Sequence, residues 1–109
     1  MAVEVDQVGD IRRIILSGRL DAEGVTEVET EFHEAATAEP NVIVDLTAVP
    51  FLASLGIRML VSASQDQQKV GGKVVLVSPD ETTLRILKTT GIHHLIPVTE
   101  SVDEAVSQF

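Results

Sequence analysis

The chain has 109 residues, 44% of them hydrophobic, which is enough to bury a core without disulfides or a bound metal. It has no cysteine, which excludes disulfide scaffolds, thiolate nucleophiles and cysteine-rich zinc sites. Its 17 acidic and 8 basic residues give a net charge of −9, which opposes binding to nucleic acid or anionic lipid. With neither a membrane-spanning run nor a signal-peptide pattern, we expect one cytoplasmic domain over residues 1–109, without direct membrane insertion.

The sequence opens with the pattern of a β-hairpin. Alternating apolar residues at Val3 and Val5, with Val8 after a one-residue slip, predict the first strand, and the apolar positions in 11–16 predict the second. The Gly-Asp dipeptide at 9–10 is a two-residue turn signal between them. We therefore expect two antiparallel strands at the start of the chain.

An amphipathic helix and a buried strand follow. Between residues 24 and 38 the apolar side chains recur every three or four positions with glutamates between them, and Pro40 ends this pattern. Residues 41–46 show no polar alternation until Asp45, which is typical of a strand covered on both faces. We expect this strand to be central in the sheet.

A second helix is predicted over residues 55–70, with Ser54 as its N-cap and the glycines at 71–72 as its end. Four residues are expected on its inward stripe: Ile57, Leu60, Val61 and Ser64. Residues 73–77 then repeat the pattern of a buried strand.

The last part of the chain predicts a helix, a strand and a helix. Asp80 caps a third helix that ends at Gly91, residues 95–98 form a short strand, and Ser101 opens a terminal helix with capping-box spacing. Strands and helices that alternate in this way imply right-handed crossovers. The predicted fold class is α/β, with a single mixed, partly parallel sheet packed with about four helices.

The chain carries no recognisable catalytic or metal-binding pattern. His93 and His94 are adjacent and are expected to face opposite ways on an extended segment, while His33 lies on a distant helix. No phosphate-binding glycine loop and no Gly-x-Ser-x-Gly elbow occur, and Ser54 has no nearby His or Lys to act as its base. We expect no enzymatic activity, catalytic residue, cofactor or metal.

Residues 42–57 form the most informative stretch: an apolar strand, an Asp-Leu-Thr step, a bulky Phe-Leu pair, and then Ala53, Ser54 and Leu-Gly-Ile. This order resembles the signature of the STAS domains, the anti-sigma-factor antagonists, in which an Asp-Ser-x-Gly-Leu/Ile step carries the phosphorylated serine. Ser54 matches that serine, whereas Ala53 stands where the family usually has Asp. Segments 18–21 and 84–92 extend the resemblance over nearly the whole chain.

The resemblance implies a small mixed sheet with packed helices, no active site, and a role as a reversible protein partner. In the best-known form of the family, the unphosphorylated domain binds an anti-sigma factor that is also a serine kinase. Phosphorylation of the serine releases the domain, and a serine phosphatase resets it. An alternative is a constitutive, non-phosphorylated STAS subunit of a larger complex, such as a lipid-transport ATPase or a stress-signalling assembly. A nucleotide-sensing domain is a third interpretation.

Ser54 is interpreted either as the phosphorylation site or as a plain helix cap. Leu52, Leu55 and Met59 form either an apolar contact patch beside it or part of the core. Asp21 and Glu23 either meet a basic partner or are simply solvated, and Gly56 reflects either close approach of a partner or tight internal packing. The expected partner-binding residues are Asp21, Glu23, Leu52, Ala53, Ser54, Leu55, Gly56 and Met59.

Overall fold

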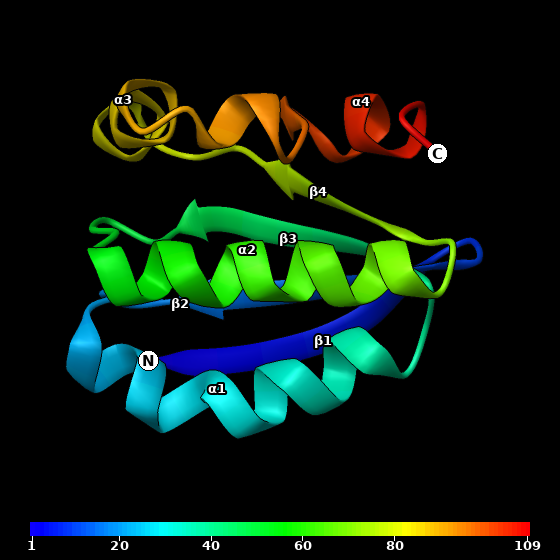
Figure 1. Ribbon diagram of the computed structural model, residues 1–109, viewed down its shortest axis with the longest axis horizontal. Helices are drawn as coiled ribbons and strands as arrows, with labels where there is room; N and C mark the ends of the chain where they lie inside the picture. The colour runs from blue at the N-terminus through cyan, green and yellow to red at the C-terminus, as the bar shows by residue number, and fades with distance from the viewer.

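Five strands form one mixed sheet in the computed structural model, which describes residues 1–109 (Figure 1). In chain order they are β1 (Ala2–Val8), β2 (Ile11–Ser17), β3 (Asn41–Ala48), β4 (Lys73–Val77) and β5 (Val98–Thr99). They lie in the sheet in that same order, with β1 antiparallel to β2 and all later neighbours parallel. The predicted mixed sheet and the central position of β3 are confirmed.

Four α-helices and a short 3-10 helix pack on this sheet: α1 (Ala22–Thr37), α2 (Ser54–Lys69), α3 (Glu81–Thr89), η1 (Ile92–His94) and α4 (Val102–Val106). The first two run side by side over one face of the sheet (Figure 1), and with α3 they enclose a core cluster of 20 residues. On the other face, Ala105 of α4 packs with Ile43 and Val75. No helix is both long enough and apolar enough to cross a membrane.

The central strand β3 is covered on both faces. Val42 and Val44 point into the cluster under α1 and α2, while Ile43 between them belongs to the cluster under α4, and all three are fully buried. Successive side chains of a strand point to opposite faces, so both faces must be apolar here. The expectation of a strand without polar alternation is confirmed.

The hairpin differs from the expectation in one detail. β1 and β2 pair in continuous register from Ala2 opposite Ser17 to Val8 opposite Ile11, so the predicted slip before Val8 is wrong. With regular alternation, Val8 simply lies on the opposite face from Val3 and Val5. The predicted turn at residues 9–10 is present, and its glycine has a φ of 63°, a conformation that favours glycine.

The short last strand predicted at residues 95–98 is present as β5, but its predicted bounds are wrong. Gly91 adopts a left-handed conformation with a φ of 77°, the chain then winds into η1, and β5 begins only at Val98. Leu95 is 60% exposed, since it belongs to this turn and not to a strand. His93 and His94 therefore do not lie on extended backbone, and their ring centroids are 3.9 Å apart. The predicted boundaries of α3 and the Ser101 cap of α4 are confirmed.

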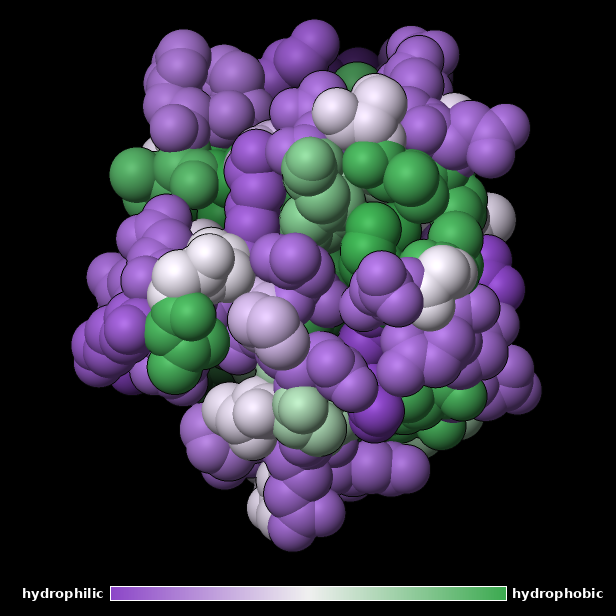
Figure 2. Space-filling model, turned by 90° about the vertical axis from the view of Figure 1, so that its right-hand side faces the viewer, coloured by the Kyte–Doolittle hydropathy of each residue, from purple (hydrophilic) through white to green (hydrophobic).

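The carboxyl ends of β2, β3 and β4 lie at one end of the molecule, at the left of Figure 1. The opposite end holds the β1–β2 turn and the C-terminus, and Figure 2 shows separate hydrophobic patches there among hydrophilic side chains. Its exposed large hydrophobic residues include Val70 after α2 and Phe109 at the C-terminus.

Candidate functional site

Two loops that are distant in sequence meet at the start of α2. Leu20, after β2, forms a parallel bridge with Leu52, after β3. The Leu20 N–H donates to the carbonyl of Phe51 at 2.9 Å, and the Ala53 N–H donates to the carbonyl of Leu20 at 3.0 Å. These bonds fix the backbone on which α2 begins, and they place Asp21 at the same end of the sheet as Ser54, as expected.

Ser54 is the first residue of α2 and not its N-cap. Ala53 is the N-cap, with extended backbone (φ −97°, ψ 174°), and its carbonyl already accepts the first helical hydrogen bond from Ile57 at 3.0 Å. The helix therefore begins one residue earlier than predicted, because the bond from Ala53 to Leu20 holds Ala53 in the capping conformation. The Ser54 side chain is exposed and makes no hydrogen bond within the protein.

The first turn of α2 lacks the acceptors that the other helices possess. Asp21, Asp80 and Ser101 each accept a backbone N–H in the first turn of α1, α3 and α4, and all three helices also carry an acidic residue there. Ala53 offers no side-chain acceptor, and the first turn of α2 has no acid. The N–H groups of residues 54–56 consequently have no acceptor in the protein, and the positive end of the helix dipole is left uncompensated.

Asp21 is engaged within the domain. Its carboxylate accepts the Gly24 N–H at 2.9 Å as the N-cap of α1, and the Arg19 Nε lies 3.4 Å from the other oxygen. The hydrogen bond from Gly24 lowers the pKa of the Asp21 carboxyl, and Arg19 acts in the same direction. The Arg19 guanidinium also lies 4.2 Å from the centre of the Phe51 ring, a contact the sequence analysis missed. Glu23 is exposed in the first turn of α1.

Leu52 and Gly56 are buried, so neither belongs to a surface patch. Leu52 is 2% exposed and packs in the main core cluster. A Cβ atom at Gly56 would lie 2.7 Å from the carbonyl oxygen of Leu20 and 2.8 Å from its Cγ. The Leu20–Leu52 bridge passes directly beneath the first turn of α2, and this internal packing accounts for the glycine.

The predicted inward stripe of α2 is only partly correct. Ile57 and Val61 are half-buried, whereas Leu60 and Ser64 are buried as expected. The fully covered face consists of Gly56, Leu60, Ala63, Ser64 and Gln67. It is rotated from the prediction because α1 packs along one side of α2.

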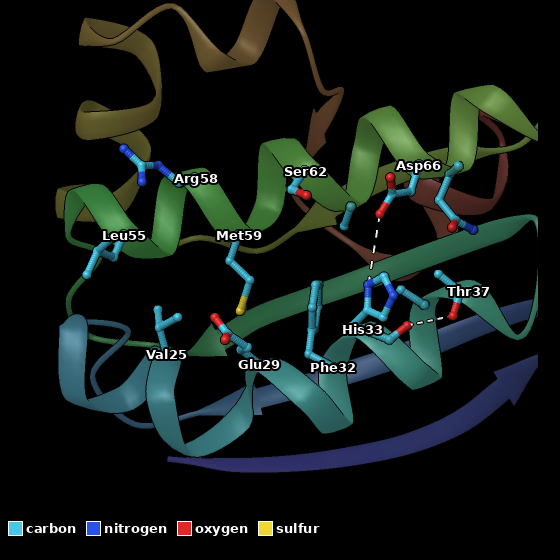
Figure 3. Close-up of a pocket in the computed structure, with 13 residues that line it drawn as sticks. Val25, Glu29, Phe32, His33, Thr37, Leu55, Arg58, Met59, Ser62 and Asp66 are labelled. Carbon is cyan, nitrogen blue, oxygen red and sulfur yellow. Dashed lines mark hydrogen bonds and ion pairs between the residues drawn. The ribbon is translucent and has the colours of Figure 1, made fainter.

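A groove of about 360 Å³ runs between α1 and α2 and reaches Leu55, the residue after Ser54 (Figure 3). Leu55, which is 41% exposed, and the half-buried Met59 line it from α2, and Val25 and Phe32 line it from α1. In Figure 3 the Met59 side chain points from α2 toward α1. Of the predicted apolar patch, Leu55 and Met59 therefore reach a surface next to Ser54.

Charged side chains border the same groove. Glu29 and His33 lie on α1, and Arg58 and Asp66 lie on α2. The His33 Nδ1 atom is 3.9 Å from a carboxylate oxygen of Asp66. No group of three or more His, Asp or Glu side chains lies close enough together to hold a metal ion.

Arg58 is the residue beside Ser54 that the sequence analysis missed. It is exposed and lies four residues after Ser54 on α2. The signal that could have found it is the i, i+4 spacing, which places two side chains on the same face of a helix.

The sequence profile of the STAS domain family matches residues 2–105 of the chain. BtrV of Bordetella bronchiseptica, whose name assigns it by inference to the anti-sigma factor antagonists, is 21% identical over 100% of this chain and 95% of its own.

Three solved structures, of two proteins, share the fold over nearly the full chain. An anti-sigma factor antagonist from Mycobacterium paratuberculosis has a TM-score of 0.89 at 23% identity, covering 98% of this chain and 92% of that one. The anti-sigma factor antagonist SpoIIAA of Bacillus has a TM-score of 0.79 in its unphosphorylated form, at 20% identity, covering 98% of this chain and 95% of that one. Its phosphorylated form has a TM-score of 0.72 at 19% identity, covering 98% of each chain.

Proposed function

Because the chain belongs to the STAS domain family, we propose that it is an anti-sigma-factor antagonist that binds an anti-sigma factor with serine-kinase activity and is released by phosphorylation of Ser54. The names of BtrV and of the mycobacterial and Bacillus structures support this role. One observation carries the assignment of the residue. Ser54 matches the serine of the family signature, and its hydroxyl is exposed and unpaired on the first residue of α2.

The proposed reaction is a phosphoryl transfer in which this chain is the substrate. The Ser54 Oγ forms a bond to the γ-phosphorus of ATP held by the kinase, while the bond from that phosphorus to the β–γ bridging oxygen breaks. ADP leaves, and the hydroxyl proton passes to a base of the kinase or to water. A serine phosphatase reverses the change by hydrolysis, which restores the hydroxyl and releases inorganic phosphate.

A phosphate on Ser54 is compatible with the fold at the start of α2, but it opposes the binding of a partner at that surface. The modification adds roughly −1.5 to −2 charges, and the unpaired N–H groups of residues 54–56 favour an anion at this end of the helix. A partner packed on Leu55 and Met59 meets that charge directly. Against a like charge at about 4 Å the repulsion is about 4 kcal/mol at an effective dielectric near 20, or about a thousandfold in affinity.

A second candidate function is a constitutive STAS subunit of a larger complex. The observation that favours it is Ala53, since an alanine at the N-cap of α2 can neither orient the Ser54 hydroxyl nor pair with a basic group of a kinase. In this role Ser54 is never phosphorylated, and the surface around it stays bound to another subunit of the complex.

Binding of purified anti-sigma serine kinases to matched variants distinguishes the two. We expect Ser54→Ala to bind like the wild type and to resist phosphorylation, and Ser54→Glu to bind more weakly, because Glu supplies part of the phosphate charge. Ser62→Glu is the matched control, since Ser62 is also exposed on α2 but lies two helical turns further along. Equal affinities for wild type, Ser54→Ala and Ser54→Glu contradict the switch and favour the constitutive subunit.

A further inference from the structure

We propose that Arg58 binds the phosphate on Ser54, so that phosphorylation turns a free cation on α2 into one member of an internal ion pair. This inference rests on the proposed function in one respect, that Ser54 is the residue that carries the phosphate. It assigns a role to a side chain of this chain and does not depend on the identity of the kinase.

The helix geometry brings the two groups together. Ser54 and Arg58 both lie in α2 and are four positions apart in the sequence, which places their Cβ atoms about 5–6 Å apart on one face. Side chains in a helix lean toward its N-terminus, so the later residue of the pair reaches back over the earlier one. In Figure 3 the Arg58 guanidinium lies toward the start of α2 and away from α1.

Arg58 is also free to make the contact. The other four arginines, Arg12, Arg13, Arg19 and Arg85, each pair with an acidic side chain. Arg58 makes no such pair within 4.0 Å, although the chain has a net charge of −9. An exposed arginine without an acidic partner, one turn after an exposed and unpaired hydroxyl, is therefore available to an anion on that hydroxyl.

The acidic side chains that border the same groove as Arg58 do not pair with it. Asp66, eight residues further along α2, lies near His33 and Lys69. Glu29 borders the groove from α1, and no ion pair joins it to Arg58. The competing cation is Arg19, which reaches the same end of the sheet but lies against Asp21 and Phe51.

Guanidinium suits this task. Its planar fork donates two parallel N–H groups to phosphate oxygens, and it is charged at every relevant pH. Pairing stabilises the dianion of the phosphate over the monoanion. An exposed i, i+4 ion pair with the anion on the N-terminal side changes an equilibrium constant by about twofold. Phosphorylation would then both add an anion and withdraw the Arg58 cation from the surface beside Leu55.

The test uses the full chain with phosphoserine installed at position 54 during translation, followed by a phosphorus NMR titration at low salt. We expect the second acid dissociation constant of the phosphate to be about twofold smaller in Arg58→Gln than in the otherwise unchanged chain. Arg58→Lys keeps the charge and should fall between the two. Arg85→Gln removes an exposed arginine of α3 as the matched control and should have no effect.

Equal dissociation constants with and without Arg58 contradict the inference, as does a change produced by Arg19→Gln in place of Arg58→Gln. Because the phosphoserine is installed without a kinase, these results are separate from the proposed function. A chain whose Arg58 fails to bind the phosphate can still be a kinase substrate. A chain that no kinase modifies would contradict the switch and leave the measured pairing intact.

Discussion

At the scale of single residues, Ala53 is the position where the chain departs most clearly from the usual pattern of its family. Its methyl group occupies the N-cap of α2, and three backbone N–H groups remain without acceptors. Ala53→Asp should raise the free energy of unfolding by about 1 kcal/mol, because the carboxylate accepts one of these N–H groups. Urea denaturation measures the change.

The variant Ala53→Asn separates the cap from its charge, since Asn is about as good a cap as Asp but is neutral. We expect Asn to keep most of the gain. If neither variant is more stable than the wild type, the start of α2 is not an uncapped helix end. Where a kinase uses this carboxylate, Ala53→Asp should also speed phosphorylation of Ser54.

Loss of the Ser54 hydroxyl should lower the free energy of unfolding less than loss of a side chain that caps a helix. Because its hydroxyl makes no hydrogen bond within the protein, Ser54→Ala should change the free energy of unfolding by less than about 0.5 kcal/mol. Asp80→Ala is the comparison: it removes the carboxylate that accepts the Thr83 N–H at 2.7 Å, and should cost about 1 kcal/mol. A loss in Ser54→Ala equal to that in Asp80→Ala would mean that Ser54 caps its helix after all.

At the scale of elements, one ion pair joins the two strands of the hairpin. Arg13 on β2 pairs with Asp6 on β1, and this hydrogen bond lowers the pKa of the Asp6 carboxyl below its ordinary value. A carboxyl whose pKa is lower in the folded state adds stability above its unfolded pKa, and that stability is lost as the pH falls through the folded pKa.

We therefore expect stability to decline as the pH falls below about 4, and Asp6→Asn to make that decline shallower. Glu4→Gln is the control, because Glu4 lies on the same face of the same strand and has no cationic partner. Thermal unfolding between pH 5 and pH 2 measures the slope. A slope that Asp6→Asn leaves unchanged would show that the pair is too exposed to matter.

The elements themselves were largely predictable from local patterns. The apolar residues of α1 recur every three or four positions, which predicted an amphipathic helix. Val25, Val28 and Phe32 lie on its buried face in the structure, as predicted. Asp80 and Ser101 were predictable as caps, because each has a side-chain oxygen and directly precedes a helical pattern. In the structure each accepts the backbone N–H of the residue three positions later. The start of β5 was not predictable, because Gly91 turns the chain into a 3-10 helix, and apolar spacing does not distinguish that helix from a strand.

The candidate site was less predictable, because contacts distant in sequence determine it. Ser54 is a better cap than Ala53 by residue preference, yet the bond from Ala53 to Leu20 makes Ala53 the cap. The same bridge buries Leu52 and requires a glycine at position 56. No local pattern indicates that residue 20 pairs with residue 52. The sequence also left Leu55 open between a contact patch and the core, and the structure leaves it 41% exposed at the groove between α1 and α2.

At the scale of the whole molecule, the fold holds the start of α2 in place, so we expect phosphorylation of Ser54 to leave the backbone there unmoved. The start of α2 is fixed by the bonds between its two loops and by the core under its first turn. A phosphate on Ser54 lands on an exposed position outside that core, so the fold should remain nearly unchanged. Under the proposed function, we expect release of a partner to come from repulsion and lost packing at Ser54, Leu55 and Met59.

Amide chemical shifts of the free and phosphorylated protein test this local mechanism. We expect changes confined to about residues 52–60 and the neighbouring loops, because the charge is at an exposed helix end. The strands at residues 42–46 and 74–77 serve as the internal control. Widespread shifts in them would indicate a rearrangement of the sheet and contradict release by local repulsion.

Under the proposed function, a phosphate on Ser54 decides whether the partner binds. The most direct measurement is a calorimetric titration of the anti-sigma kinase with the unmodified protein and with protein carrying phosphoserine at position 54. We expect tight binding of the unmodified form and a loss of affinity of up to about a thousandfold on phosphorylation. Equal affinity of the two forms would contradict the proposed switch.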